Sequence, residues 1–192
     1  MSTRFTLIAH AATEAQRTAA FPTDEAITEC ERERLASHGW RAPRASHICS
    51  APELRAQETA RRLGLEAETE GALRDCDYGR WRGRTMDEIQ AEDPAALMTW
   101  LTAPDAAPHG GESVTQLIER VGAWLDAAST QQHTVAVTHP AWIRAAIVHT
   151  LRLPAPLFWR FDIAPLTLTD LRRSGEVWTV RCTGCGLLAT EP

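Results

Sequence analysis

RFTLIAH, residues 4–10, is an apolar run of strand length that ends at His10. A second run of the same kind, TVAVT at 134–138, is followed directly by His139. Short apolar runs of this sort are typical of buried strands. The carboxyl ends of parallel strands share one edge of a sheet, and ligands bind there in open α/β sheets. We therefore expect two imidazoles to lie together at that edge.

Helical and strand patterns alternate along the rest of the chain. The expected strands are 4–9, 45–49, 134–138, 166–171 and 176–182, and the expected helices are 24–38, 52–63 with Ser50 as its N-cap, 85–101, 112–128 and 140–151. A Ser174-Gly175 turn joins the last two strands as a hairpin. The pattern predicts an α/β fold: a three-layer sandwich with a mostly parallel central sheet and an antiparallel C-terminal edge. A length of 192 residues suits a single domain over residues 1–192.

Composition excludes several classes of protein. The formal net charge is −5, with acidic and basic residues interleaved, which argues against a nucleic-acid-binding surface. No run approaches the roughly 18–20 apolar residues of a membrane span, and the first apolar run is too short for a signal peptide. The five cysteines are scattered, and Cys182 and Cys185 form a lone C-x-x-C, too few ligands for zinc. We expect a cytoplasmic protein without nucleic-acid or membrane partners.

Five segments of this chain carry polar residues in a fixed order. They are LIAHAAT (7–13), CSAPELRAQETA (49–60), ALRDCDYGRWRG (72–83), HGGESV (109–114) and AVTHPAWIRA (136–145). They resemble the motifs R-H-G-[EQ]-[TS], S-S-P-x-x-R-A-x-Q-T-A, L-R-E-x-x-x-G-x-W-E-G, G-G-E-S and V-x-H-G of the histidine phosphatase (phosphoglycerate mutase-like) superfamily. Order and spacing together make the resemblance specific, and the chain is identified as a divergent member of that superfamily.

The resemblance implies a phosphatase that hydrolyses small phosphate monoesters in two steps, without a cofactor or a metal. His10 would attack phosphorus and hold a phosphohistidine, because a neutral imidazole is a competent nucleophile. Arg55 would clamp the phosphoryl oxygens with its planar, charged fork. His139 would stabilise charge on the transferring group. Asp75 stands where the family has its general-acid glutamate, and Asp77 is the alternative.

Two further residues are candidates for substrate binding. Ser50 and the helix that follows it offer hydrogen-bond donors to an anion. Glu112, in the G-G-E-S segment, either lines the substrate pocket or caps the N-terminus of the next helix. Trp81 and Trp142 lie in motif segments and are expected to border the pocket, whereas the other tryptophans are expected to pack in the core.

Three positions depart from the family motifs. Ala9 replaces the arginine before the nucleophile. Losing one charge-assisted hydrogen bond of roughly 1.5–3 kcal/mol would weaken phosphate affinity about tenfold to a hundredfold. Ala11 and Pro140 replace glycines, which restricts the backbone at one position and removes an N–H at the other. Arg17 and Arg144 are candidates to supply the missing charge, unless both are ordinary surface residues.

The departures leave two other functions open. One is a catalytically impaired or repurposed protein that binds or transforms a less charged metabolite. The other is an enzyme that uses His10, His139 and Asp75 for acid–base chemistry on an unphosphorylated substrate. For partners we expect a small phosphorylated molecule, and the apolar segment LRLPAPLFWRFDIAP (151–165) suggests the interface of a homodimer.

Overall fold

Within the described residues, the protein folds around one six-stranded sheet. The structure is a computed structural model that describes residues 2–37, 39–127 and 132–187. The strands are β1 (Ser2–Ala9), β2 (His47–Ser50), β3 (Glu68–Thr69), β4 (His133–Thr138), β5 (Thr167–Ser174) and β6 (Val177–Gly186). Their order is β3-β2-β4-β1-β5-β6. The first four of these run parallel, and β5 pairs antiparallel with both β1 and β6. The mostly parallel sheet with an antiparallel C-terminal edge is confirmed.

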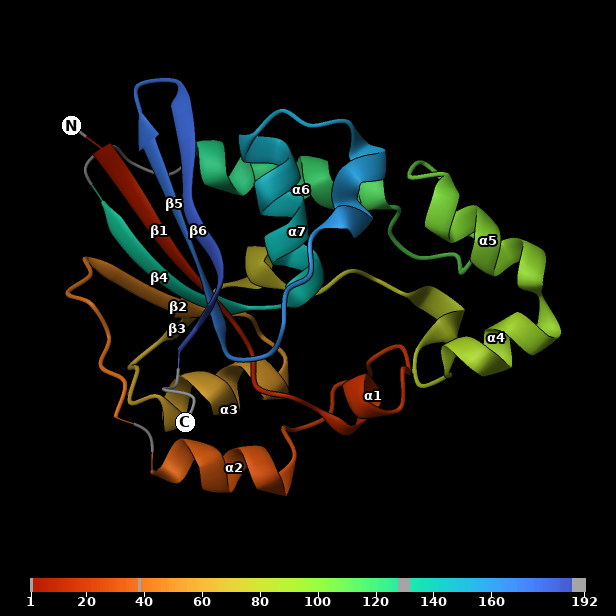
Figure 1. The fold of residues 1–192 in the computed structure, drawn as a ribbon, viewed down its shortest axis with the longest axis horizontal. Helices are drawn as coiled ribbons and strands as arrows, with labels where there is room; N and C mark the ends of the chain where they lie inside the picture. The colour runs from red at the N-terminus through yellow and green to blue at the C-terminus, as the bar shows by residue number, and fades with distance from the viewer. Residues whose placement is uncertain (1, 38, 128–131, 188–192) are drawn as a thin grey trace.

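Helices cover both faces of the sheet, so the three-layer sandwich is also confirmed (Figure 1). The α-helices are α1 (Glu14–Arg17), α2 (Glu29–Ala36), α3 (Leu54–Arg62), α4 (Met86–Glu92), α5 (Pro94–Thr102), α6 (Val114–Ala127) and α7 (Pro140–Thr150), and the short 3₁₀ helices are η1 (Gly71–Leu73), η2 (Gly79–Trp81) and η3 (Ala155–Arg160). α6 and α7 pack together on one side, and α2 and α3 lie on the other (Figure 1). α4 and α5 extend away from the sheet.

The two strands that precede the histidines form the centre of the core. Phe5, Leu7 and Ile8 of β1, and Val135 and Val137 of β4, are fully buried. Because helices cover both faces of these central strands, both faces must be apolar, which explains continuous apolar runs in place of alternation. In the part of the chain that the structure describes, no helix is long and apolar enough to cross a bilayer.

Two expected helices differ from the structure for local reasons. The helix expected at 24–38 begins only at Glu29, because the Thr28 side chain accepts a hydrogen bond from the Glu31 N–H and caps it there. The helix expected at 85–101 is two helices, α4 and α5. The side chain of Asp93 caps the second one, and Pro94, which has no N–H to continue the first, occupies its first position.

The predicted N-cap at Ser50 is wrong. Ser50 is the last residue of β2, whereas α3 begins at Leu54 with Glu53 as its N-cap. The carboxylate of Glu53 makes no capping hydrogen bond to the helix. The side chain of this residue is therefore free to serve a different purpose at the edge of the sheet.

Candidate active site

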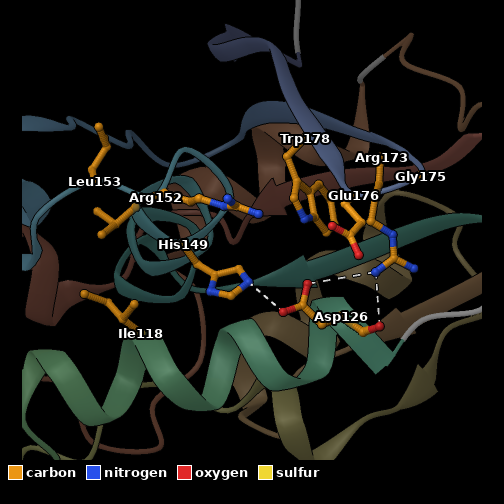
Figure 2. Close-up of a pocket in the computed structure, with 10 residues that line it drawn as sticks. Ile118, Asp126, His149, Arg152, Leu153, Arg173, Gly175, Glu176 and Trp178 are labelled. Carbon is orange, nitrogen blue, oxygen red and sulfur yellow. Dashed lines mark hydrogen bonds and ion pairs between the residues drawn. The ribbon is translucent and has the colours of Figure 1, made fainter.

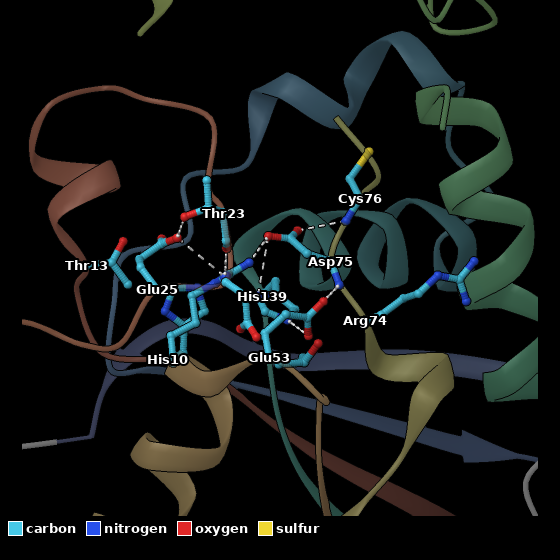
Figure 3. Close-up of polar contacts among 12 residues, drawn as sticks. His10, Thr13, Thr23, Glu25, Glu53, Arg74, Asp75, Cys76 and His139 are labelled. Atoms are coloured by element: carbon cyan, nitrogen blue, oxygen red, sulfur yellow. Dashed lines mark hydrogen bonds and ion pairs between the residues drawn. The ribbon is translucent and has the colours of Figure 1, made fainter. Parts of the chain in front are cut away.

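Two buried histidines meet at the carboxyl edge of the sheet (Figure 3). β1 and β4 pair in parallel with Ala9 opposite Thr138, so His10 and His139 leave the two strands at the same level. Their ring centroids are 5.1 Å apart. The structure thus brings the two imidazoles together at the edge of the sheet that the sequence pattern predicted.

The ring of His10 is held as a neutral tautomer with one free nitrogen. Its Nδ1 lies 2.8 Å from the backbone oxygen of Ala11. A carbonyl oxygen only accepts hydrogen bonds, so Nδ1 carries the proton and Nε2 keeps its lone pair. Burial, followed by the charges of His139 and Arg55, lowers the pKa of His10 from 6.5 to about 3. The unprotonated Nε2 of this ring is therefore available as a nucleophile at neutral pH.

A carboxylate faces each ring nitrogen of His139 (Figure 3). Its Nε2 lies 2.8 Å from Oε2 of Glu53, and its Nδ1 lies 3.4 Å from Oδ2 of Asp75. Because a carboxylate only accepts hydrogen bonds, Nε2 of His139 is the donor to Glu53. Burial on its own would raise the pKa of Glu53, but the hydrogen bond and charge of His139 lower it to about 2. His139 and Glu53 therefore form a hydrogen-bonded pair at the site.

Arg55 and Asp75 form an ion pair above the histidines. Arg55, on α3, is almost fully buried, and its Nη2 lies 2.7 Å from Oδ2 of Asp75. Its Nη1 donates to the backbone oxygen of Thr23 at 2.6 Å. Burial raises the pKa of Asp75, but the charges of His139 and Arg55 outweigh it and hold that pKa below its ordinary value. One oxygen of Asp75 thus lies next to both Arg55 and His139.

The structure separates the two candidates for the general acid. Asp75 lies at the histidines, and its backbone N–H donates to Oε1 of Glu53 at 3.0 Å. Asp77 is about half exposed and pairs with Arg82 at 3.0 Å. Its carboxylate also accepts a hydrogen bond from the Gly79 N–H, as a turn residue does. The geometry therefore favours Asp75 over Asp77.

Glu112 supports the loop that carries Asp75 and does not face the histidines. Both of its carboxylate oxygens accept from Arg120, at 2.7 and 2.8 Å. The same guanidinium donates to the backbone oxygens of Ala72, Arg74 and Asp75. Glu112 therefore acts on the site through Arg120, and its expected place in the substrate pocket is not what the structure shows.

Three other expected contributors lie away from the histidines. Arg17 pairs with Glu14 at the surface, where both side chains are 66% exposed. Arg144 donates through Nε to the backbone oxygen of Phe161. Neither guanidinium contacts His10 in the described part of the chain, so neither replaces the charge lost at position 9. Ser50 lines a separate hollow with Gln57, Ala60, Arg61, Leu65, Ala67 and Thr69.

The two glycine replacements fit the local backbone. Ala11 is fully buried and is not among the described residues with a positive φ, so its side chain causes no backbone strain. Its N–H donates to Oγ1 of Thr59 at 3.0 Å. Pro140 is the first residue of α7, a position whose N–H would have no partner within the helix. These two departures therefore leave the position of the histidines intact.

Sequence analysis missed the second acidic residue at the site. Glu53 occupies a variable position of the S-S-P-x-x-R motif, so the motif itself assigns it no role. A signal was present nonetheless, because Glu53 stands two residues before Arg55 at the junction of β2 and α3. Glu25 adds to the negative charge, with Oε2 4.0 Å from Arg55. Near His10, the permanent positive charge of Arg55 thus faces the carboxylates of Glu25, Glu53 and Asp75.

The tryptophans of the motif segments pack in the core and do not border a pocket. Trp81 is buried against Phe21 and Trp100. Trp142 is fully buried and donates its indole N–H to the backbone oxygen of Ala72. The aromatic residues that do line a cavity near the site include Trp100 and Trp159, which were expected only to pack.

The hollow beside the residues that pair with His139 is small. It has a volume of about 150 Å³ and is lined by residues that include Glu53, Arg55, Asp75 and Tyr78, whereas the two histidines are buried behind this lining. A larger hollow, of about 680 Å³, lies beside the β5–β6 hairpin (Figure 2). Ser174, at that hairpin, pairs with Ser2 at the start of β1, so this hollow is at the opposite edge of the sheet from His10. Size therefore does not identify the reactive site.

Within the described residues, no group of three or more histidine, cysteine, aspartate and glutamate side chains has an arrangement that would hold a metal ion. The pair of histidines is instead surrounded by ion-paired carboxylates and one guanidinium. Such a set of groups can bind an anion, move protons and present a nucleophile.

Comparison with known proteins gives one family. The model of the histidine phosphatase superfamily (branch 1) matches residues 5–185. A glucosyl-3-phosphoglycerate phosphatase from Mycobacterium tuberculosis is 32% identical over 122 residues, which cover 56% of this chain and 55% of that protein. Phosphoserine phosphatase 1 from Hydrogenobacter thermophilus is 29% identical over 112 residues, 56% of this chain and 53% of that protein. The chain thus spans about half the length of these relatives.

The likeness of the fold extends further than that of the sequence. The crystal structure of the α-ribazole phosphatase from Shigella flexneri superposes with a TM-score of 0.82 at 20% identity. The superposition covers 98% of this chain and 100% of that one. The two proteins therefore share the same fold.

Proposed function

We propose, since the chain belongs to branch 1 of the histidine phosphatase superfamily, that it hydrolyses small phosphate monoesters through a phosphohistidine on His10. In the first step Nε2 of His10 attacks phosphorus as the bond to the ester oxygen breaks, and Asp75 gives a proton to the leaving alcohol. In the second step Asp75 takes a proton from water. The water oxygen then attacks phosphorus, and the N–P bond breaks to release inorganic phosphate.

The observation that carries this proposal is the surroundings of Asp75. Arg55 donates to Oδ2 at 2.7 Å, and Nδ1 of His139 lies 3.4 Å from the same atom without a hydrogen-bond partner of its own. A carboxylate oxygen and a phosphoryl oxygen accept the same donors. The carboxylate of Asp75 thus stands in for one oxygen of the substrate, between Arg55 and the imidazole that lies 5.1 Å from His10.

Substrate binding would also prepare Asp75 to act as an acid. The charges of His139 and Arg55 hold the pKa of Asp75 low against the effect of burial. When a phosphoryl group engages those donors, the opposing effect of burial dominates and the pKa rises. A carboxyl released in this way can hold the proton that the leaving alcohol requires.

One observation favours the second candidate function, a protein that binds or transforms a less charged metabolite. Ala9 supplies no charge, and Glu53 places a carboxylate 2.8 Å from His139. A dianionic phosphate would therefore meet one guanidinium and several carboxylates. If this repulsion dominates, the reacting group carries at most one negative charge.

A panel of phosphate esters separates the two candidates. We expect wild-type enzyme to hydrolyse monoesters, vanadate to inhibit competitively, and His10→Ala to abolish turnover. His47→Ala, which changes a histidine of β2 outside the site, is the matched control and should retain activity. If no monoester is hydrolysed and vanadate does not bind, the phosphatase proposal is wrong and the less charged ligand is favoured.

A further inference from the structure

An aromatic cavity adjoins the small hollow that Arg55 and Asp75 line. It has a volume of about 220 Å³. Pro22, Cys76 and Tyr78 line both spaces, so the two are neighbours with a common wall. The rest of an ester whose phosphoryl group binds to Arg55 would therefore lie close to this cavity.

The wall of the cavity is built mainly from rings and apolar side chains. The rings are Phe21, Tyr78, Trp100, Phe158 and Trp159. They fix one another through edge contacts, with ring centroids 4.7 Å apart for Trp100 and Trp159 and 5.3 Å apart for Phe21 and Trp100. Interlocked rings of this kind form a preorganised apolar surface, to which a flat ring binds with little loss of side-chain entropy.

One polar group of the wall has no partner. The indole Nε1–H of Trp100 is buried, with no hydrogen-bond partner in the described residues, and the residue is only 6% exposed. Less than 1 Å² of this nitrogen is accessible, so it faces packed protein and not the open space of the cavity. The cation of the wall, Arg144, donates to the backbone oxygen of Phe161 and lies 5.9 Å from the ring centre of Phe158.

We propose that this cavity binds the alcohol part of the substrate, and that this part is an apolar ring system. The inference rests on the proposed phosphatase function and adds the chemical class of its ester. An apolar cavity of about 150 Å³ holds one benzene molecule. The available 220 Å³ therefore fits one substituted ring or two fused rings.

Polar esters fit this wall less well. The hydroxyls of a sugar, or the charged groups of an amino acid, need several hydrogen-bond partners when they are buried. The described wall offers few polar side chains besides Tyr78, Trp100 and Arg144. The cavity therefore selects aromatic or other flat apolar alcohols.

Three esters of primary alcohols test this with leaving groups of similar reactivity: propyl phosphate, 2-phenylethyl phosphate and 2-(4-acetylphenyl)ethyl phosphate. Removing about 100 Å² of ring surface from water should raise kcat/KM about fiftyfold from the first ester to the second. The effect should appear mainly in KM. The acetyl group adds a polar oxygen for which the wall offers few partners, so it should add nothing to the gain from the ring.

Variants assign these effects to the cavity. Trp100→Ala removes one ring from the wall, so it should remove much of the gain from the phenyl ring. Trp178→Ala, the matched change at a tryptophan of the far hollow, should keep that gain. Met86→Trp adds volume to the wall of the cavity and should reduce the preference for phenyl esters, with circular dichroism showing that it folds.

A binding experiment on His10→Ala separates failure of this inference from failure of the phosphatase proposal. The free alcohol 2-(4-acetylphenyl)ethanol should shift the indole N–H resonance of Trp100, assigned by its absence in Trp100→Phe. If the alcohol shifts this resonance and no ester is hydrolysed, the cavity inference holds and the phosphatase proposal fails. If all three esters are hydrolysed with equal kcat/KM and the alcohol causes no shift, the cavity inference is overturned.

Discussion

Two regions of the molecule hold a histidine against a carboxylate, and only one has the features of a reactive site. At the carboxyl edge of the sheet His139 lies 2.8 Å from Glu53, and at the opposite edge His149 lies 3.0 Å from Asp126 (Figure 2). The side chain of His139 is fully buried, whereas that of His149 is 27% exposed and that of Asp126 is 54% exposed. A contact between a histidine and a carboxylate therefore does not by itself identify an active site.

The difference lies in what surrounds each pair. A second buried histidine and a buried arginine stand beside His139, and its neighbours have strongly shifted pKa values. The far hollow has more than four times the volume but mixes exposed charges of both signs. Burial strengthens electrostatic interactions, and solvent screens exposed ones. Convergence of buried groups, and not the size of a hollow, identifies the site.

The largest effect should come from the nucleophile. We expect His10→Ala to lower kcat/KM at least about a thousandfold, because the variant lacks the nitrogen that would form the bond to phosphorus. His149→Ala, in the far hollow, should stay within about threefold of wild type. Steady-state hydrolysis of a phosphate monoester measures both. Equal losses in the two variants would erase the distinction between the regions.

The general acid should give the next effect. Asp75→Asn removes the proton that we assign to the leaving alcohol and should lower kcat for an alkyl ester about a hundredfold to a thousandfold. A p-nitrophenyl ester needs less help from an acid, so its loss should be smaller. Asp126→Asn is the matched control from the far hollow. A similar loss for both esters in Asp75→Asn would mean that this residue has a structural role only.

Substitution of Arg55, the expected clamp of the phosphoryl oxygens, should mainly weaken substrate binding. Arg55→Lys keeps the charge but loses the two-pronged geometry, so we expect KM to rise about tenfold to a hundredfold with a smaller change in kcat. Arg152→Lys, in the wall of the far hollow, should leave KM unchanged. Inhibition constants for vanadate should follow the same order. An unchanged KM in Arg55→Lys would remove Arg55 from the anion site.

Substitution of Glu53 should give the smallest effect on the site, seen in the affinity for phosphate. It should also change the free energy of unfolding. Glu53→Gln removes a negative charge from the site, so we expect inorganic phosphate to bind about threefold to tenfold more tightly. Glu176→Gln, at the far hollow, should not change phosphate affinity. Isothermal titration calorimetry measures both affinities. Weaker phosphate binding in Glu53→Gln would show that this carboxylate helps the site hold an anion.

The stability of the same pair of variants should depend on pH. The folded pKa of Glu53 is about 2, below its ordinary value of 4.5, so its ionised form stabilises the folded state above about pH 4.5. That stabilisation is lost as the pH falls from about 4.5 toward 2. Wild type should therefore exceed Glu53→Gln in free energy of unfolding at neutral pH, with the difference shrinking in acid.

Much of the fold could be predicted because it depends on local patterns. The apolar runs before His10 and His139 gave β1 and β4, since central parallel strands must be apolar on both faces. The helix breaks at Thr28 and Pro94 were also encoded locally, by a capping side chain and a missing N–H. These two signals were present in the sequence but were outweighed by longer helical periodicity.

The site could be predicted only in part, because the direction of a side chain depends on distant residues. The motif segments contain His10, His139, Arg55 and Asp75, and the structure brings these four residues together. The motifs assigned no role to Glu53. They left Glu112 either at the substrate or as a helix cap, whereas its pairing with Arg120 depends on how α6 packs against the loop before Asp75. Packing of this kind has no signature in a single sequence.

The most direct test of the central claim is to trap the phosphorylated enzyme. Wild-type protein is mixed with a radiolabelled phosphate ester, quenched in alkali within one turnover, digested and mapped by mass spectrometry. We expect an alkali-stable, acid-labile label on the peptide that contains His10, present in His149→Ala and absent in His10→Ala. Continued ester hydrolysis with no label on His10, or with the label on another residue, would contradict the claim that His10 is the nucleophile.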